Sequence, residues 1–278
     1  MKNKISSFYP TLKQSWIMFV IFVIAGSIFA AAICLPLQSL FPNQELISKF
    51  LMYVLSFAPT FLYIYLKSRR VETPSIEVNE SFSPIKNKFF LYIILALSTL
   101  SISVVLEPLM SLFPTPEWFN KLMEQTIGGN IYISILTVAV AAPILEELLC
   151  RGTILRGLLK HTSPVKAILW SSFIFAALHL NPWQGIFSFI LGCFIGWIYY
   201  RTRSIWAGIF IHTVNNLTIT LITHFSPEVS VTTSFKDLIG NTNQYMLIFA
   251  MCAAILALSL AYLIRYVNTN IQKDEPTR

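Results

Sequence analysis

The stretch IYISILTVAVAAPILEELLC, residues 131–150, decides the fold class of this chain. It carries no charge before Glu146, and it is as long as the roughly 20 apolar residues that a helix needs to cross a bilayer. It therefore predicts a transmembrane helix. Glu146 and Glu147 nevertheless lie inside it and Arg151 follows it, where each ionised group costs several kcal/mol unless it is paired or usefully solvated. These three charges need a structural or a functional explanation.

The rest of the chain has the composition of a membrane protein. Of its 278 residues, 55% are hydrophobic and 12% are charged, whereas a soluble domain has about 25% charged residues. The predicted fold is an all-α, polytopic membrane helix bundle with about eight transmembrane helices, and a single membrane domain covers residues 1–278. The runs long enough to span a bilayer are 16–37, 47–66, 89–112, 131–150, 165–181, 184–200, 204–223 and 244–264.

The distribution of basic residues predicts the orientation. With a cytoplasmic N-terminus, 17 of the 20 lysines and arginines fall on the cytoplasmic side, and only Lys49, Lys121 and Lys236 fall outside. Cytoplasmic loops carry such an excess of basic residues, so both termini are expected in the cytoplasm of a multi-pass cell-membrane protein. The net charge of +7 is attributed to this topology, because no RNA- or DNA-binding pattern accompanies it. We therefore expect the chain to interact with the lipid bilayer and not with nucleic acid.

Polar residues from three predicted helices should lie in one layer. The helical pattern after residue 150 continues to Lys160, which makes a helix of about 45 Å from Ile131, so its last turns should project into the cytoplasm and Glu146 should stay buried. The turn HTSP, residues 161–164, then begins the next helix at Pro164. Glu146 and His179 are equidistant from this turn and should lie level in an antiparallel hairpin. His212 lies about 12 Å along the helix that begins near Ser204.

Spacing on each helix indicates which groups are paired. Glu147 and Arg151 are four residues apart with the acid first, which is the favourable order for an ion pair. Glu146 is rotated by about 100° from Glu147 and is left to face a cavity. His212 and Asn216 share a helix face in the same way.

This set of side chains suits hydrolysis. A water held between Glu146 and the imidazoles of His179 and His212 could pass a proton to the carboxylate and attack a peptide carbonyl, while Asn216 and a histidine stabilise the oxyanion. Alternatively, Glu146, His179 and His212 could bind zinc, which accepts such nitrogen and oxygen ligands. Two simpler interpretations are side chains that reach the interface independently and hydrogen bonds that only join helices. They do not explain a shared depth.

Three motifs in order resemble one family. Residues 146–151 (EELLCR) match EExxxR, residues 175–179 (FAALH) match FxxxH, and residues 212–216 (HTVNN) match HxxxN. Together they resemble the CPBP family of intramembrane proteases, which includes type II CAAX prenyl endopeptidases and the bacteriocin-processing or immunity-associated Abi proteins. The resemblance covers residues 131–223, the expected catalytic core.

The resemblance implies a role for each motif residue. Glu146 would be the general base, with His179, His212 and Asn216 completing the catalytic set. Glu147, Arg151 and Phe175 would support the site. The motifs leave open a zinc cofactor or a glutamate-activated water without metal.

The resulting hypothesis is an intramembrane endopeptidase. It would cleave a peptide or membrane-protein substrate near the cytoplasmic face, as in CAAX processing or in the processing of a bacteriocin or peptide pheromone. The alternative is a non-catalytic immunity or scaffold protein with the same fold. An ion or proton carrier ranks below both, because the polar residues form one layer and none continues a path to the outer face of the membrane. A cysteine protease that pairs Cys150 with His179 ranks last, since Cys150 would need its own activated thiolate.

Overall fold

The computed structural model describes residues 9–41, 45–69, 89–127, 129–226 and 234–270. Both termini therefore lie outside the described residues, and their predicted cytoplasmic location stays a prediction. The same holds for seven of the basic residues that were assigned to the cytoplasmic side. They are Lys2, Lys4, Arg70, Lys86, Lys88, Lys273 and Arg278.

All regular structure in the described part of the chain is helical. The first half contains α1 (Leu12–Val20), η1 (Ile21–Gly26), α2 (Ser27–Leu40), α3 (Glu45–Ser56), α4 (Ala58–Ser68), α5 (Phe89–Met110) and α6 (Glu117–Ile127). A long continuous helix follows, made of α7 (Ile131–Ser134), η4 (Ile135–Ala141), α8 (Ala142–Leu149), η5 (Cys150–Leu155) and α9 (Arg156–His161). The last elements are α10 (Pro164–Ala177), α11 (Pro182–Thr202), α12 (Ile205–Phe225), α13 (Phe235–Ile239) and α14 (Thr242–Asn270).

Seven of these helical segments are long and apolar enough to cross a membrane, and the predicted multi-pass helical membrane protein is confirmed. They are Leu12–Leu40, Ile47–Ser68, Phe89–Met110, Ile131–His161, Pro182–Thr202, Ile205–Phe225 and Thr242–Asn268. The predicted run 165–181 forms the shorter apolar helix Pro164–Ala177. At about 1.5 Å per residue, its 14 residues cover about 21 Å, which is less than the hydrocarbon core.

The short length of α10 has a local cause. Asn181 is extended, as is usual before a proline, and its side-chain oxygen accepts a hydrogen bond from the backbone N–H of Gln184 (2.8 Å). Pro182 then begins α11. Leu180 has a positive φ of 55°, which completes the tight turn between the two helices. The chain therefore reverses before α10 can reach the length of a full span.

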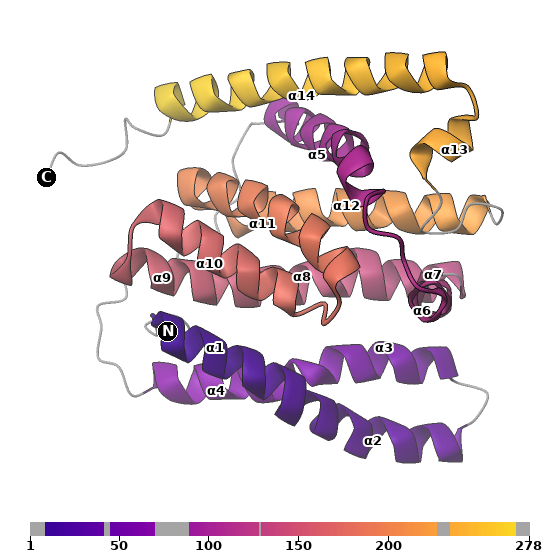
Figure 1. Ribbon diagram of the computed structural model, residues 1–278. Helices are drawn as coiled ribbons and strands as arrows, with labels where there is room; N and C mark the ends of the chain where they lie inside the picture. The colour runs from indigo at the N-terminus through magenta and orange to yellow at the C-terminus, as the bar shows by residue number, and fades with distance from the viewer. Residues whose placement is uncertain (1–8, 42–44, 70–88, 128, 227–233, 271–278) are drawn as a thin grey trace, which may run out of the picture.

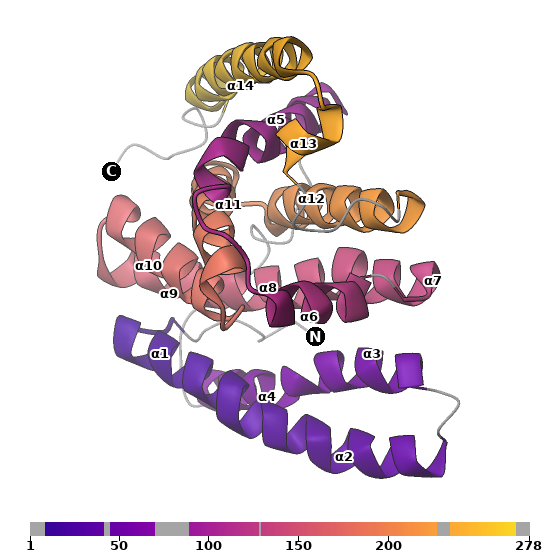
Figure 2. The same cartoon turned by 45° about the vertical axis from the view of Figure 1, so that its right-hand side comes forward.

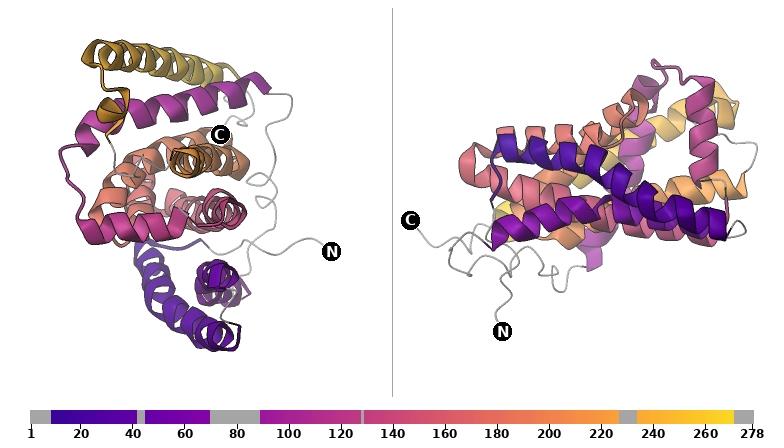
Figure 3. Two further views of the ribbon diagram at one scale, coloured as in Figure 1. Left: turned by 90° about the vertical axis from the view of Figure 1, so that its right-hand side faces the viewer. Right: turned by 90° about the horizontal axis from the view of Figure 1, so that it is seen from below.

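The helices are stacked in layers around the long helix α7–α9. Figure 1 shows α1 to α4 on one side of it, and α12, α5 and α14 in succession on the other. Helices α10 and α11 pack against each other, and α11 runs through the middle of the bundle (Figure 2). The end-on view in Figure 3 shows the long helix and α12 side by side, which agrees with their direct packing.

The outer surface is apolar, as expected for helices surrounded by lipid. Large hydrophobic side chains are strongly exposed on the peripheral helices, among them Leu62 on α4, Phe90 on α5 and Leu258 on α14. The buried core is centred on the long helix, where Leu149, Ile154 and Leu155 are fully enclosed. Glu147 and Arg151 are equally buried there, so the charges of the opening stretch are in the interior of the bundle.

The long helix has two wide turns on either side of the carboxylates. Pro143 lacks an N–H and cannot continue the regular hydrogen-bond ladder, and the π-helical segment η4 ends two residues before it, at Ala141. The second π-helical segment, η5, begins at Cys150. Segments of this kind are rare and occur frequently at functional sites. Between them lies the short helix α8, which carries Glu146 and Glu147.

Candidate active site

Glu147, Arg151 and His212 form a buried chain of polar contacts. Arg151 donates from Nη1 to Glu147 Oε1 at 2.8 Å, which is the ion pair that the spacing predicts. The same carboxylate oxygen lies 3.2 Å from Nδ1 of His212 on α12. Arg151 also donates from Nη2 to the carbonyl oxygen of Gly192 on α11 (3.0 Å). The pair is thereby anchored to two other helices and fixes the orientation of the His212 ring.

Phe175 of α10 is the common neighbour of the three charged or imidazole groups. The guanidinium of Arg151 lies 4.5 Å from the centroid of its ring, within the range of a cation–π contact. The His212 and His179 rings approach edge to face, with centroid distances of 5.3 and 5.4 Å. The aromatic ring thus brings the EExxxR, FxxxH and HxxxN motifs into one cluster.

Glu146, directly before Glu147 on α8, also points toward His212. Its Oε2 lies 4.0 Å from Nε2 of His212, which is too far for a hydrogen bond. Its Oε1 accepts a hydrogen bond of 2.6 Å from the hydroxyl of Tyr53 on α3. Oε2 is buried and has no hydrogen-bond partner among the described residues. The free carboxylate of the prediction therefore has one oxygen fixed and one directed at an imidazole.

His179 lies in the turn that follows α10 and not on the helix, because the chain reverses at residues 178–181. Its Nδ1 is 3.1 Å from the carbonyl oxygen of Phe175. Since a carbonyl can only accept, Nδ1 carries the proton in the neutral ring and Nε2 accepts from the hydroxyl of Ser188 on α11 (3.3 Å). Both ring nitrogens are thus hydrogen-bonded, and His179 contacts the cluster by packing against the ring of Phe175.

Asn216 faces the long helix one turn after His212. Its Nδ2 donates to the carbonyl oxygen of Val138 in η4 (2.8 Å), and its Oδ1 accepts from Asn215 (3.0 Å). Carbonyls in a π-helical turn are displaced from regular bonding, so the amide satisfies one of them. The predicted common face of His212 and Asn216 is present, since both side chains contact the helix that carries the two glutamates.

The comparison with protein families agrees with this arrangement. Residues 128–218, about a third of the chain, match the family model described as type II CAAX prenyl endopeptidase Rce1-like. This match supports membership of this part of the chain in the CPBP family. The matched segment contains all three motifs and most of the predicted core, 131–223. The family indicates a protease. No curated protein and no solved structure matches the chain.

The donor set of the CPBP-family domain does not fit the zinc site that was considered from the sequence. Among the described residues, no three His, Cys, Asp or Glu side chains are grouped so that they could hold a metal ion. Glu146 and His212 are neighbours, but Nε2 of His179 is directed at Ser188. A third ligand is therefore missing from the proposed set, and we derive no step through a metal.

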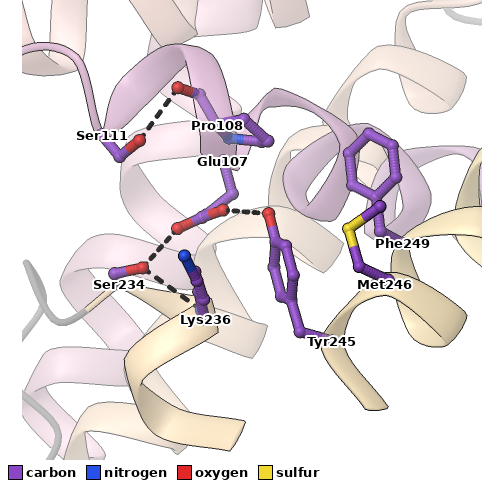
Figure 4. A pocket seen from close by; sticks show the side chains of 8 residues that line it. All are labelled: Glu107, Pro108, Ser111, Ser234, Lys236, Tyr245, Met246 and Phe249. Atoms are coloured by element: carbon purple, nitrogen blue, oxygen red, sulfur yellow. Dashed lines mark hydrogen bonds between the residues drawn. The ribbon is translucent and has the colours of Figure 1, made fainter. Parts of the chain in front are cut away.

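Neither Glu146 nor His212 lines either of two cavities in the described part of the chain. One, of about 350 Å³, lies where α5 ends and α13 and α14 begin. There, Glu107 accepts hydrogen bonds from Ser234 (2.6 Å) and Tyr245 (2.7 Å), as Figure 4 shows. These bonds join α5 to the C-terminal helices. The other cavity, of about 360 Å³, lies between α2 and α3 and includes Tyr53 in its wall.

Sequence reasoning missed two contacts of the site. Tyr53 lies 93 residues before Glu146, and no motif or periodicity relates the two positions. The contact of His212 with Glu147 was missed because spacing on a helix identifies only neighbours on the same helix. Both contacts depend on the packing of separate helices.

Proposed function

We propose that the protein is an intramembrane endopeptidase in which Glu146 activates the attacking water. The observation that carries the proposal is the pair formed by Glu146 Oε2 and His212 Nε2, buried and 4.0 Å apart. This pair lies in a segment whose family indicates a protease. The carboxylate is the base, and the imidazole orients the nucleophile.

The separation of the two atoms suits one water molecule. Seen from a water about 2.8 Å from each of them, the two atoms would be about 90° apart, so one O–H bond could be directed at each with little bending. Glu147 can only accept at Nδ1 of His212, so the neutral ring has its proton on Nδ1 and a lone pair on Nε2. The water would donate one hydrogen to Nε2 and the other to Glu146. Its own lone pairs would then point toward a substrate carbonyl.

The reaction follows from this position. Glu146 Oε2 takes a proton from the water while the water oxygen forms a bond to the carbonyl carbon, which gives a tetrahedral oxyanion. The proton then passes from Glu146 to the nitrogen of the leaving amine, and the C–N bond breaks. The products are a carboxylic acid and an amine, and Glu146 is again ionised. A positioned acid–base group of this kind contributes about 10² to 10⁴-fold to the rate.

The two adjacent glutamates would have separate roles. Glu147 is paired with Arg151 at 2.8 Å and is fully buried, so it is already committed to a cation and supports His212. Glu146 has no cation at hydrogen-bond distance among the described residues. We therefore assign proton transfer to Glu146 alone and treat Glu147 and Arg151 as the support for the imidazole.

Asn216 and His179 are proposed to complete the site. The amide of Asn216 has a second hydrogen besides the one donated to Val138, and we assign it to the oxyanion. The role of His179 is proposed from its FxxxH motif and its contact with Phe175. A histidine that donates to the oxyanion would have to exchange its bond with Ser188.

The substrate is proposed to be a peptide or protein held at the membrane. The family description names a CAAX prenyl endopeptidase, and the apolar exterior of the bundle suits a substrate that is held at the bilayer. A lipid-modified C-terminal peptide and a processed bacteriocin or pheromone precursor both meet this requirement. Cleavage is proposed near the cytoplasmic face of the cell membrane.

The test compares the membrane peptides of cells that express the wild type or Glu146→Gln. The substitution keeps the shape of the side chain but removes a useful proton acceptor, so uncut substrates should accumulate while the variant protein remains at normal abundance. Glu124→Gln, at an exposed position on α6, is the matched control and should resemble the wild type. Identical peptide profiles in all three strains would contradict the proposal and favour a scaffold protein.

A further inference from the structure

The general base is held by a residue from outside the CPBP-family segment. Tyr53 belongs to α3, whereas the family match begins at residue 128. Its hydroxyl donates to Glu146 Oε1 at 2.6 Å. That length is typical of a charge-assisted O–H···O⁻ bond, which is about twice as strong as a bond between neutral groups. The N-terminal helices thus reach the reacting carboxylate directly.

The bond decides which carboxylate oxygen faces the nucleophile. The terminal torsion of a glutamate is broad and roughly two-fold, so an unrestrained carboxylate would not keep one oxygen on one partner. With Oε1 bound to Tyr53, Oε2 is the oxygen that lies 4.0 Å from His212 Nε2. The proposed water lies between those two atoms.

The position of the hydroxyl is itself fixed by aromatic packing. The Tyr53 ring meets Phe57 edge to face with centroids 5.5 Å apart. Phe57 is fully buried and packs against Phe22 at 4.6 Å. Tyr53 also lines the cavity between α2 and α3, so its ring is not enclosed on every side. Removal of the hydroxyl alone should therefore leave this packing in place.

We propose that Tyr53 is a positioning residue that orients Glu146 for proton transfer. The inference rests on the proposed function, because it assigns to Tyr53 the alignment of the base named there. It predicts that the phenol oxygen, and not the ring, is what catalysis requires. It also predicts that the N-terminal helices are necessary for the reaction and do more than anchor the domain.

The experiment uses the full-length protein in proteoliposomes and a synthetic peptide that spans a cleavage site found in the Glu146→Gln comparison. Tyr53→Phe removes the hydroxyl and keeps the ring. A hydrogen bond to a charged group contributes about 1.5 to 3 kcal/mol, so kcat should fall by about tenfold or more, with KM and protein abundance unchanged. Tyr132→Phe, at an exposed position at the start of α7, is the matched control and should cleave normally.

The possible results separate this inference from the proposed function. Wild-type cleavage by Glu146→Gln would contradict the proposed function. An inactive Glu146→Gln together with a Tyr53→Phe that matches Tyr132→Phe would overturn the role of Tyr53 alone. A raised KM with normal kcat would instead make Tyr53 a substrate contact, and a parallel loss of folded protein would make it structural. Either result would also overturn the inference.

The bond can be tested without proteolysis. If Tyr53 and Glu146 interact as proposed, the effects of Tyr53→Phe and Glu146→Gln on thermal unfolding should not add in the double variant. Additive effects would contradict the contact. This arm decides the geometry even if no substrate is cleaved.

Discussion

Glu147→Gln tests the assignment of the second glutamate to support of the site. The substitution removes the negative charge that lies 2.8 Å from Arg151 in a pair with 1% and 0% exposed side chains. The guanidinium would then be an uncompensated charge in the interior of the bundle. An amide oxygen can still accept a hydrogen bond from Arg151, so the loss comes mainly from the charge.

The expected destabilisation is large. Removal of one partner from a buried ion pair costs about 3 to 5 kcal/mol. Arg151 retains its bond to Gly192 and its contact with Phe175, which favours the lower end, about 3 kcal/mol. For a chain of this size, about 1 kcal/mol corresponds to 2 to 4 °C in Tm. The variant should therefore unfold about 6 to 12 °C below the wild type.

The assay is thermal unfolding of purified protein in detergent. Glu117→Gln is the control, because Glu117 forms an ion pair of the same spacing with Lys121 at 2.7 Å but on the exposed face of α6. Exposed pairs contribute less than about 1 kcal/mol, so this control should change Tm little. Equal shifts in the two variants would show that the buried Glu147–Arg151 pair contributes no more to stability than the exposed Glu117–Lys121 pair. The double variant Glu147→Gln/Arg151→Met should recover stability, because it leaves no unpaired charge.

Gly208, metal chelation and Cys150 supply three further tests. A Cβ at Gly208 would lie 2.9 Å from both Glu147 Oε2 and Ile195 Cγ2. Gly208→Ala should therefore displace the carboxylate, lower the cleavage rate and reduce stability by about 1 to 3 kcal/mol, seen as a lower Tm. A wild-type cleavage rate and Tm would show that the carboxylate can move freely. Treatment with 1,10-phenanthroline should leave peptide cleavage unchanged, and inhibition reversed by zinc would contradict the metal-independent route. Cys150 is fully buried, so Cys150→Ala should cleave normally; an inactive variant at normal abundance would indicate a thiol nucleophile.

The spans could be predicted because their signal is local. A run such as 131–150 must be apolar over its whole length to cross a bilayer, and the helix Ile131–His161 contains it together with the predicted continuation beyond residue 150. The run 165–181 was predicted too long, although Asn181 and Pro182 are a recognisable helix start. Hydropathy alone does not distinguish a short helix and a turn from one longer helix.

The site could be predicted only in part, for a related reason. Motif spacing identified the Glu147–Arg151 pair and the shared face of His212 and Asn216, because these contacts are made along one helix or by one face. The bonds of Tyr53 to Glu146 and of Asn216 to Val138 join segments that are far apart in sequence. The π-helical turns on either side of α8 also change which side chains and carbonyl groups face the neighbouring helices. Residue spacing does not reveal these turns.

The most direct test of the central claim is the rate at which purified Glu146→Gln cleaves, in proteoliposomes, the peptide that accumulates in cells with this variant. If Glu146 is the general base, kcat should fall about 10² to 10⁴-fold below that of the wild type. Abundance and Tm should be unchanged or higher, because a charge is removed from an apolar layer. Cleavage at the wild-type rate would contradict the claim and show that a group other than Glu146 activates the nucleophile.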